Sequence, residues 1–217
     1  LEKIFQEQEL ACVIMEPMNI EYPKDGFLKG VKELAHKNNA LFILDETITG
    51  FRYSLGGAQE LFGVTPDLAT FGKGMTNGYP LSAVVGSNEV MQKVEDIFFS
   101  GTFGGETLSL AAASKIIDKY KKEQVIEHFS EVGSYLLEKL NQLINDKNLG
   151  DIFWTSGHPS WSFLHIKEQE KYNIFEIKTF FLQEMFKRGI LTLVSHNISL
   201  SHTKEIVDQL LDVYTEV

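Results

Sequence analysis

Short apolar runs alternate with an amphipathic stretch through the first part of the chain. The runs are "CVIME" (12–16), "ALFILDE" (40–46), "DLATFG" (67–72) and "LSAVVG" (81–86). Continuous apolar character over so few residues is typical of strands buried on both faces of a parallel sheet. Residues 25–39 lie between the first two runs and place apolar side chains at helical spacing, with Asp25 as the expected N-cap. Strand, helix and strand in this order form a βαβ unit, which predicts an α/β fold with a mostly parallel sheet.

The character of the sequence changes in the second half. Helical stretches are expected from Glu106 through about 122 and over 125–144, strands with a turn at 157–159 within 151–168, a helix at 175–188, a short strand at 189–194, and a helix at 202–215 opened by His202 or Thr203. This order predicts a smaller α+β domain after the first one. We place the boundary between 1–125 and 126–217.

Charge and cysteine content narrow the classes of function. The 217 residues carry a net charge of −10, which argues against a broad electrostatic surface for nucleic acid or an anionic membrane. The only cysteine, Cys12, excludes an intrachain disulfide and suits a reducing compartment. No signal peptide is visible, and no apolar run approaches the roughly 18–20 residues of a membrane helix. We expect a cytoplasmic protein that binds neither nucleic acid nor membrane.

Three of the predicted strands end in ionisable residues, namely Glu16, the pair Asp45–Glu46, and Lys73. If these strands are parallel, their carboxyl ends share one edge of the sheet, where ligands bind in open α/β folds. A carboxylate and an amine would then face one crevice. We expect Glu16 and Glu46 to be structural, with Glu46 a hydrogen-bonding group rather than an acid or base.

A buried lysine beside an aspartate suits one kind of cofactor. A lysine amine attacks a carbonyl only when neutral, and burial at a strand end favours the neutral form. A nearby aspartate can keep a pyridine nitrogen protonated, which makes the ring an electron sink. Glycines at 72, 74 and 78 allow close approach of a flat group. The pattern suggests pyridoxal phosphate, although these residue types are common in α/β loops. A generic nucleotide-binding domain is less favoured, because no phosphate-binding glycine fingerprint follows a strand.

Three longer motifs carry a resemblance to a known family. "LDETITGFR" (44–52), "FGKGMTNGYPLSAVVG" (71–86) and "FSGTFGGETLSLAAA" (99–113) occur in this order. Together they closely resemble the class III aminotransferases of pyridoxal-phosphate fold type I, and "VIMEP" (13–17) fits the same family. The ending "LVSHNISLSHTKEIVDQLL" (193–211) is similar to the branch of glutamate-1-semialdehyde aminomutases. The resemblance implies amino-group transfer, by transamination or by intramolecular exchange, and 1–125 as part of the cofactor-binding large domain.

The same resemblance implies roles for individual residues. Lys73 matches the lysine that forms a Schiff base with the cofactor and relays a proton, and Asp45 matches the partner of the pyridinium nitrogen. Thr47 stands where the family packs a side chain, usually valine, on the ring face. Thr102 matches the threonine that reaches the cofactor phosphate of the neighbouring subunit, and small residues before a helix suit an anion. A homodimer with shared active sites follows from that role.

The family's N-terminal half, with its main phosphate-binding loop, has no counterpart in these residues. We therefore expect the C-terminal half of a longer enzyme, inactive by itself. The alternative is a catalytically inactive dimerisation or scaffold module. No metal site is expected, because His196 and His202 lack the spacing of a helical ligand pair. Structural roles are favoured for both, with a substrate-pocket role for Ser195 or His196 kept open.

Overall fold

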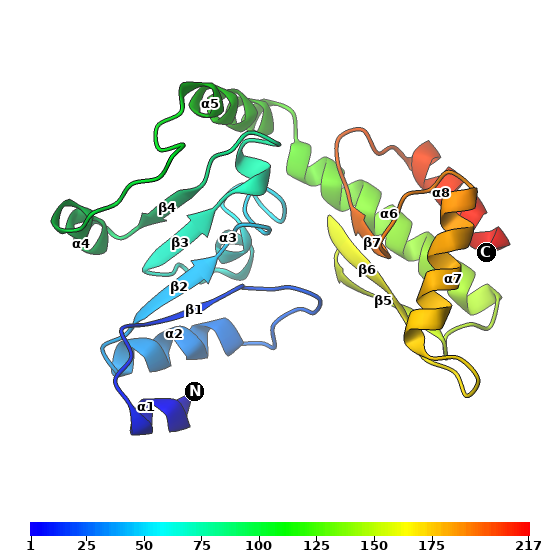
Figure 1. Ribbon diagram of the computed structural model, residues 1–217, viewed down its shortest axis with the longest axis horizontal. Coiled ribbons are helices and arrows are strands. Elements are labelled where there is room, and N and C mark those ends of the chain that lie inside the picture. Colours follow the sequence, from blue (N-terminus) through cyan, green and yellow to red (C-terminus); the bar gives the residue numbers. More distant parts are fainter. The chain divides into compact units, whose positions relative to one another are not determined.

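The computed structural model describes all 217 residues, and the chain divides into two compact units. Unit 1 comprises Leu1–Asn19 and Pro23–Ile126, and unit 2 comprises Ile20–Tyr22 and Glu127–Val217. Each unit has its own sheet, of four strands in unit 1 and three in unit 2 (Figure 1). No helix is both long enough and apolar enough to cross a membrane.

The four-stranded sheet of unit 1 has the order β1-β2-β3-β4. Its strands are β1 (Cys12–Met15), β2 (Leu41–Asp45), β3 (Leu68–Phe71) and β4 (Ala83–Gly86). The helical elements are α1 (Glu2–Glu7), α2 (Phe27–Lys37), α3 (Ala58–Phe62), η1 (Lys73–Met75), α4 (Asn88–Met91), η2 (Gln92–Asp96) and α5 (Thr107–Lys122). The predicted βαβ unit is confirmed, because β1 and β2 pair in parallel and α2 connects them.

The last strand of this sheet differs from the expectation. β2 and β3 are parallel, but β4 runs antiparallel to β3, and most of its residues are exposed. The connection over 72–82 is shorter than the dozen or more residues that a parallel crossover needs, so the chain returns beside β3. The sheet is therefore mixed and mostly parallel.

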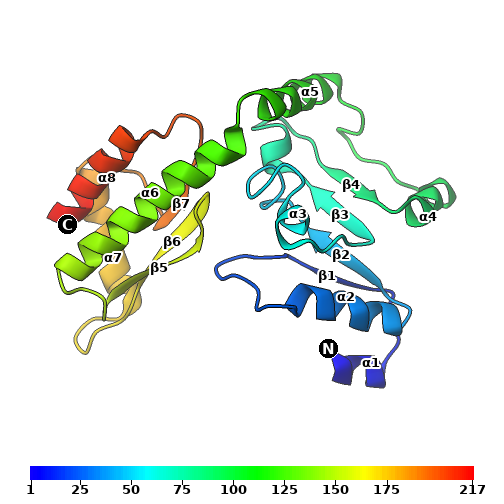
Figure 2. The ribbon, with the colours of Figure 1, turned by 180° about the vertical axis from the view of Figure 1, so that it is seen from behind.

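One face of this sheet is covered by α2, which lies beside β1 and β2 in Figures 1 and 2. Ala35 of α2 packs with the buried side chains of Phe42 and Leu44 on β2. The N-cap of α2 is Gly26, with φ +75°, and not Asp25 as expected. A glycine reaches this left-handed conformation without a steric cost, which lets the helix start one residue later.

Unit 2 packs three helices with an antiparallel sheet of order β5-β6-β7. Its elements are α6 (Val125–Asp146), β5 (Phe153–His158), β6 (Trp161–Ile166), α7 (Ile174–Lys187), β7 (Ser195–Asn197) and α8 (Lys204–Glu216). Figures 1 and 2 both show α6 running alongside the sheet. The core joins Leu140 of α6, Leu164 of β6, Met185 of α7 and Tyr214 of α8.

The short strand expected at 189–194 is displaced. The structure has no strand there and forms β7 over Ser195–Asn197 instead. Gly189 and Val194 adopt φ of +81° and +62°, which extended strand geometry excludes. Thr203 caps α8 by accepting a hydrogen bond from the amide of Ile206, in agreement with the prediction.

Candidate active site

The carboxyl ends of β1, β2 and β3 lie at one edge of the sheet of unit 1. Met15 pairs with Leu44, and Asp45 pairs with Thr70, so the three strands end almost level. Glu16 directly follows β1, Asp45 ends β2, and Lys73 comes two residues after β3. The expected shared edge is confirmed. Glu16 accepts hydrogen bonds from the side chain of Asn19 at 3.2 Å, which is a structural role.

Asp45 is held as a carboxylate. Its Oδ1 accepts hydrogen bonds from the backbone amide of Thr47 at 3.0 Å and the hydroxyl of Thr70 at 3.1 Å. The hydrogen bond from the Thr47 side chain chiefly lowers the pKa of Asp45, with contributions from the Thr47 amide, the Thr70 hydroxyl and the positive charge of Lys73. Because hydrogen bonds and an opposite charge favour the ionised form, Asp45 carries a negative charge at neutral pH.

Lys73 begins the short 3₁₀ turn η1 and has a φ of +37°. Its carbonyl accepts hydrogen bonds from the amides of Thr76 at 3.3 Å and Asn77 at 3.0 Å. The expected burial is wrong, because the Lys73 side chain is exposed. Lys73 lies in the turn beyond the end of β3 rather than in the sheet itself. Its side chain is therefore not covered by the neighbouring strands.

Glycines on both sides bring the turn close to the loop that follows β2. A Cβ added to Gly72 would lie 3.4 Å from Cγ2 of Thr47, and one added to Gly74 would lie 3.4 Å from the Gly50 carbonyl oxygen. Thr47 thus lies between the aspartate and the turn that bears the lysine. Of the predicted site residues, the structure brings together Asp45, Thr47 and Lys73.

Thr102 is separate from these three. It lies in the exposed segment between α4 and α5, where the amide of Gly104 donates to the carbonyl of Gly101 at 2.9 Å. Thr102 makes no hydrogen bond with Asp45, Thr47 or Lys73. Figure 1 shows this segment running from α4 to α5, apart from the carboxyl ends of β2 and β3. Glu106 caps α5 through hydrogen bonds to the amides of Leu108 and Ser109, both at 2.7 Å.

Sequence reasoning missed two hydroxyl groups that donate hydrogen bonds to the carboxylates of Asp45 and Glu46. Thr70 donates to Asp45, and Thr49 donates to the fully buried side chain of Glu46. A threonine in an apolar strand carries no sign of which neighbouring strand it faces, so its pairing with Asp45 depends on the sheet register. Glu46 is a hydrogen-bonding group, as expected.

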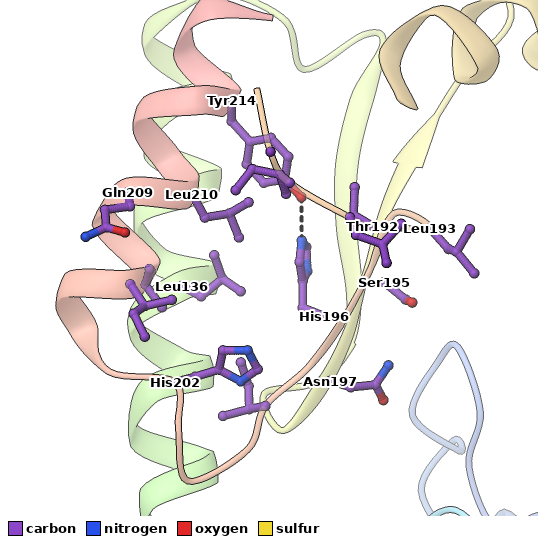
Figure 3. A pocket seen from close by; sticks show the side chains of 16 residues that line it. Leu136, Thr192, Leu193, Ser195, His196, Asn197, His202, Gln209, Leu210 and Tyr214 are labelled. Atoms are coloured by element: carbon purple, nitrogen blue, oxygen red, sulfur yellow. Dashed lines mark hydrogen bonds between the residues drawn. The ribbon is translucent and has the colours of Figure 1, made fainter. Parts of the chain in front are cut away.

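A cavity of about 550 Å³ in unit 2 contains the residues for which a pocket role was kept open. Figure 3 shows His196 in its wall, with Nε2 2.8 Å from the hydroxyl of Tyr214. Its other ring nitrogen lies 3.1 Å from the hydroxyl of Ser162, and burial lowers the pKa of His196 to about 4. With both nitrogens partnered, His196 is a neutral core histidine.

His202 has a local partner as well, because its Nδ1 accepts from the amide of Ser199 at 2.9 Å. No group of three or more His, Cys, Asp or Glu side chains in the chain is arranged to hold a metal ion.

The arrangement at the edge of unit 1 fits pyridoxal phosphate. The Asp45 carboxylate is ionised, so it can accept a hydrogen bond from a protonated ring nitrogen. The exposed Lys73 amine can reach a carbonyl carbon, and Thr47 offers a small side chain between the two. The donor set therefore matches the needs of a pyridine aldehyde.

The model of the aminotransferase class-III family matches residues 1–212. The chain belongs to this family. Among curated class-III relatives, it is 34% identical to glutamate-1-semialdehyde 2,1-aminomutase of Methanothrix thermoacetophila, over 99% of this chain and 53% of that protein. It is 32% identical to 3-aminobutyryl-CoA aminotransferase of Cloacimonas acidaminovorans, over 92% of this chain and 50% of that protein. The chain spans about half the length of the curated relatives it matches.

Solved aminotransferase structures share the fold. The FumI protein of Sphingopyxis sp. MTA144, in its PLP internal aldimine form, superposes with a TM-score of 0.89 at 23% identity, over 99% of this chain and 53% of that one. An omega-transaminase from Sphaerobacter thermophilus superposes with a TM-score of 0.87 at 22% identity, over the same shares. The fold is thus that of pyridoxal-phosphate-dependent transferases of fold type I, and the predicted α/β class is confirmed.

Proposed function

We propose that this chain is part of an enzyme that moves an amino group with pyridoxal phosphate as its cofactor. One observation carries the proposal: Asp45 and Lys73 lie at the ends of adjacent parallel strands, joined through Thr47, in a class-III aminotransferase chain. We further propose that unit 1 contributes to the cofactor-binding large domain over about 1–125, and that 126–217 form the small domain.

The bound cofactor supplies an aldehyde that condenses with amines and a ring that withdraws electrons from the substrate carbon. The Asp45 carboxylate would hold the proton on the ring nitrogen, because neighbouring hydrogen bonds keep it ionised. Nζ of Lys73 would hold the cofactor and would move a proton to and from the substrate carbon. Thr47 would pack against one face of the ring.

Thr102 binds the cofactor phosphate of a neighbouring subunit in this proposal, which requires a homodimer with shared sites. Its exposed position away from Lys73 supports a role in another subunit's site. Five large apolar side chains in this segment and the first turn of α5 are also exposed: Ile97, Phe98, Phe99, Phe103 and Leu108. Such a cluster is typical of a surface that another chain covers. The single cysteine is consistent with a cytoplasmic location.

Two substrates are the first to test, because two relatives act by name on them: glutamate-1-semialdehyde and 3-aminobutyryl-CoA. Transamination and intramolecular amino exchange use the same proton transfers. The roles proposed for Lys73 and Asp45 therefore apply to either reaction. Arg188 is occupied by Glu184 at 2.8 Å and Glu216 at 3.1 Å. The chain's other arginine is Arg52. We propose that a substrate carboxylate is bound by residues outside this chain.

The test is to add pyridoxal phosphate to the longest natural form of the protein, reduce with borohydride, and map the modified peptide by mass spectrometry. A pyridoxyl adduct on Lys73 supports the proposal, and no adduct on Lys73 contradicts it. Lys73→Ala separates the enzyme from the scaffold alternative. We expect the variant to lose about 10²–10⁴-fold in activity or more, whereas a scaffold would keep its biological role.

A further inference from the structure

The buried carboxylate next to Asp45 has no part in the chemistry proposed above. We propose that Glu46 is a positioning residue for Lys73, because it holds the loop over residues 47–57 on which the turn with Lys73 rests. The consequence for catalysis depends on the proposed function, but the position of Lys73 can be measured without the cofactor.

Every polar atom of Glu46 takes part in a hydrogen bond. Its side chain is 0% exposed and accepts hydrogen bonds from the Thr49 hydroxyl and from the amides of Ala58 and Gln59, both at 2.7 Å. Its own amide donates to the carbonyl of Thr70 at 2.9 Å. Its carbonyl accepts from the amide of Gly50 at 2.8 Å, so one residue joins the end of β3 to both ends of the loop.

The loop in turn contacts the residues on both sides of Lys73. The ring of Phe51 meets the ring of Phe71 edge to face, with centroids 5.8 Å apart. A Cβ on Gly74 would lie 3.4 Å from both the Gly50 carbonyl oxygen and Cβ of Phe51. The turn that bears the lysine is therefore packed on the part of the loop that Glu46 anchors.

The backbone of Lys73 needs such support. Its φ of +37° lies in the left-handed region, which is unfavourable for a residue with a side chain and persists only where the surroundings determine it. The C-terminal end of the loop also contacts the Glu46 carboxylate. Gly57 has a φ of +84°, and a Cβ there would collide with the carboxyl group of Glu46.

A glutamine at position 46 keeps the shape but not the hydrogen bonds. A carboxylate has only acceptors, and it meets three donors here, whereas an amide places an NH₂ group against one of them. A buried donor is then left without a partner, so the loop has to move to recover it. We expect the turn over residues 72–77 to lose its fixed position with the loop.

The experiment compares the longest natural form of the protein with its Glu46→Gln and Glu60→Gln variants, all freed of cofactor. Glu60 is the matched control, since its exposed carboxylate accepts from the amide of Gly56 in the same loop at 2.7 Å. Deuterium exchange is measured for the peptide over 69–80. In parallel, acylation of Lys73 by an amine-specific ester is followed against pH by mass spectrometry, with exposed Lys29 as the internal reference.

In Glu46→Gln we expect exchange over 72–77 to accelerate at least about fivefold, and the pH midpoint of Lys73 acylation to shift. Glu60→Gln should show the same exchange and the same Lys73 profile as the unaltered protein. The acylation profile of Lys29 should be the same in all three proteins. Equal exchange and equal Lys73 profiles in all three proteins would overturn the inference. A missing borohydride adduct in the unaltered protein overturns the proposed function instead, so the two failures are distinguishable.

A second pair of variants carries the test if Glu46→Gln does not fold. Thr49→Val removes one donor to the Glu46 carboxylate with little change of shape, and Thr49→Ser keeps it. We expect faster exchange over 72–77 in Thr49→Val, and recovery in Thr49→Ser. Equal exchange rates over 72–77 in Thr49→Val and Thr49→Ser would overturn the inference.

Discussion

Asp45 is ionised because neighbouring groups stabilise its negative charge. The hydrogen bond from the Thr47 side chain, those from the Thr47 amide and the Thr70 hydroxyl, and the charge of Lys73 all lower its pKa. We predict that Asp45→Asn lowers kcat of the longest natural form by about 10²–10³-fold, the range for losing one preorganised electrostatic contact at a reacting centre. Asp67→Asn is the control, because Asp67 precedes β3 at the opposite edge of the sheet. Equal kcat values for the two variants would contradict the role of Asp45.

His196 makes the stability of unit 2 depend on pH. Burial lowers the pKa of His196 from an ordinary 6.5 to about 4. Between these values the unfolded chain binds a proton that the folded chain does not, so stability falls as the pH drops from 6.5 towards 4. The loss amounts to about 3 kcal/mol, because each tenfold difference in proton affinity between the two states corresponds to about 1.4 kcal/mol.

We therefore predict that the free energy of unfolding of His196→Gln depends less steeply on pH between 4 and 6.5. Urea unfolding at several pH values measures this. Some slope should remain, since burial also lowers the pKa of His165 and His202. An unchanged slope in the variant would show that His196 binds its proton equally well in the folded and the unfolded chain, which contradicts the prediction.

At the scale of elements, the packing of α6 depends on a glycine, Gly133, which has no side chain. A Cβ on Gly133 would collide with the carbonyl group of Pro159, in the turn between β5 and β6. We predict that Gly133→Ala destabilises the protein by about 1–3 kcal/mol through overpacking. Gly30→Ala in α2 is the matched control, because no atom lies within 4 Å of its added Cβ. That substitution should stabilise by about 0.5–1 kcal/mol, and equal shifts of Tm would contradict the packing argument.

Elements with local signals were predicted best. The helix after Glu106 and the βαβ unit follow from patterns of apolar residues, which act over a few residues. The direction of β4 and the position of β7 were not predicted, because both depend on which strand is already in place beside them. The register that sets Thr70 against Asp45 is decided in the same way.

At the scale of the whole molecule, an exposed apolar segment predicts association. Phe98 is 95% exposed, and four further large apolar side chains lie exposed over 97–108. We predict that the longest natural form is a dimer in which this segment is protected from deuterium exchange, and that the 217-residue chain binds pyridoxal phosphate weakly and is inactive. Light scattering, exchange and an aminotransferase assay on both forms check this. Full turnover by the 217 residues alone would contradict it.

The sequence by itself determined the α/β class, the order of most elements and the identity of Lys73, Asp45, Thr47 and Thr102 as candidates. These conclusions depend on periodicity and on motifs, which neighbouring residues along the chain specify. The tertiary structure alone decided that Asp45 is ionised through Thr47 and Thr70, that Lys73 is exposed, and that Glu46 anchors the loop beneath it. Hydrogen bonding and burial depend on groups far apart in the sequence, such as Thr70 and Asp45 at 25 residues, which meet only once strand register and loop packing are set.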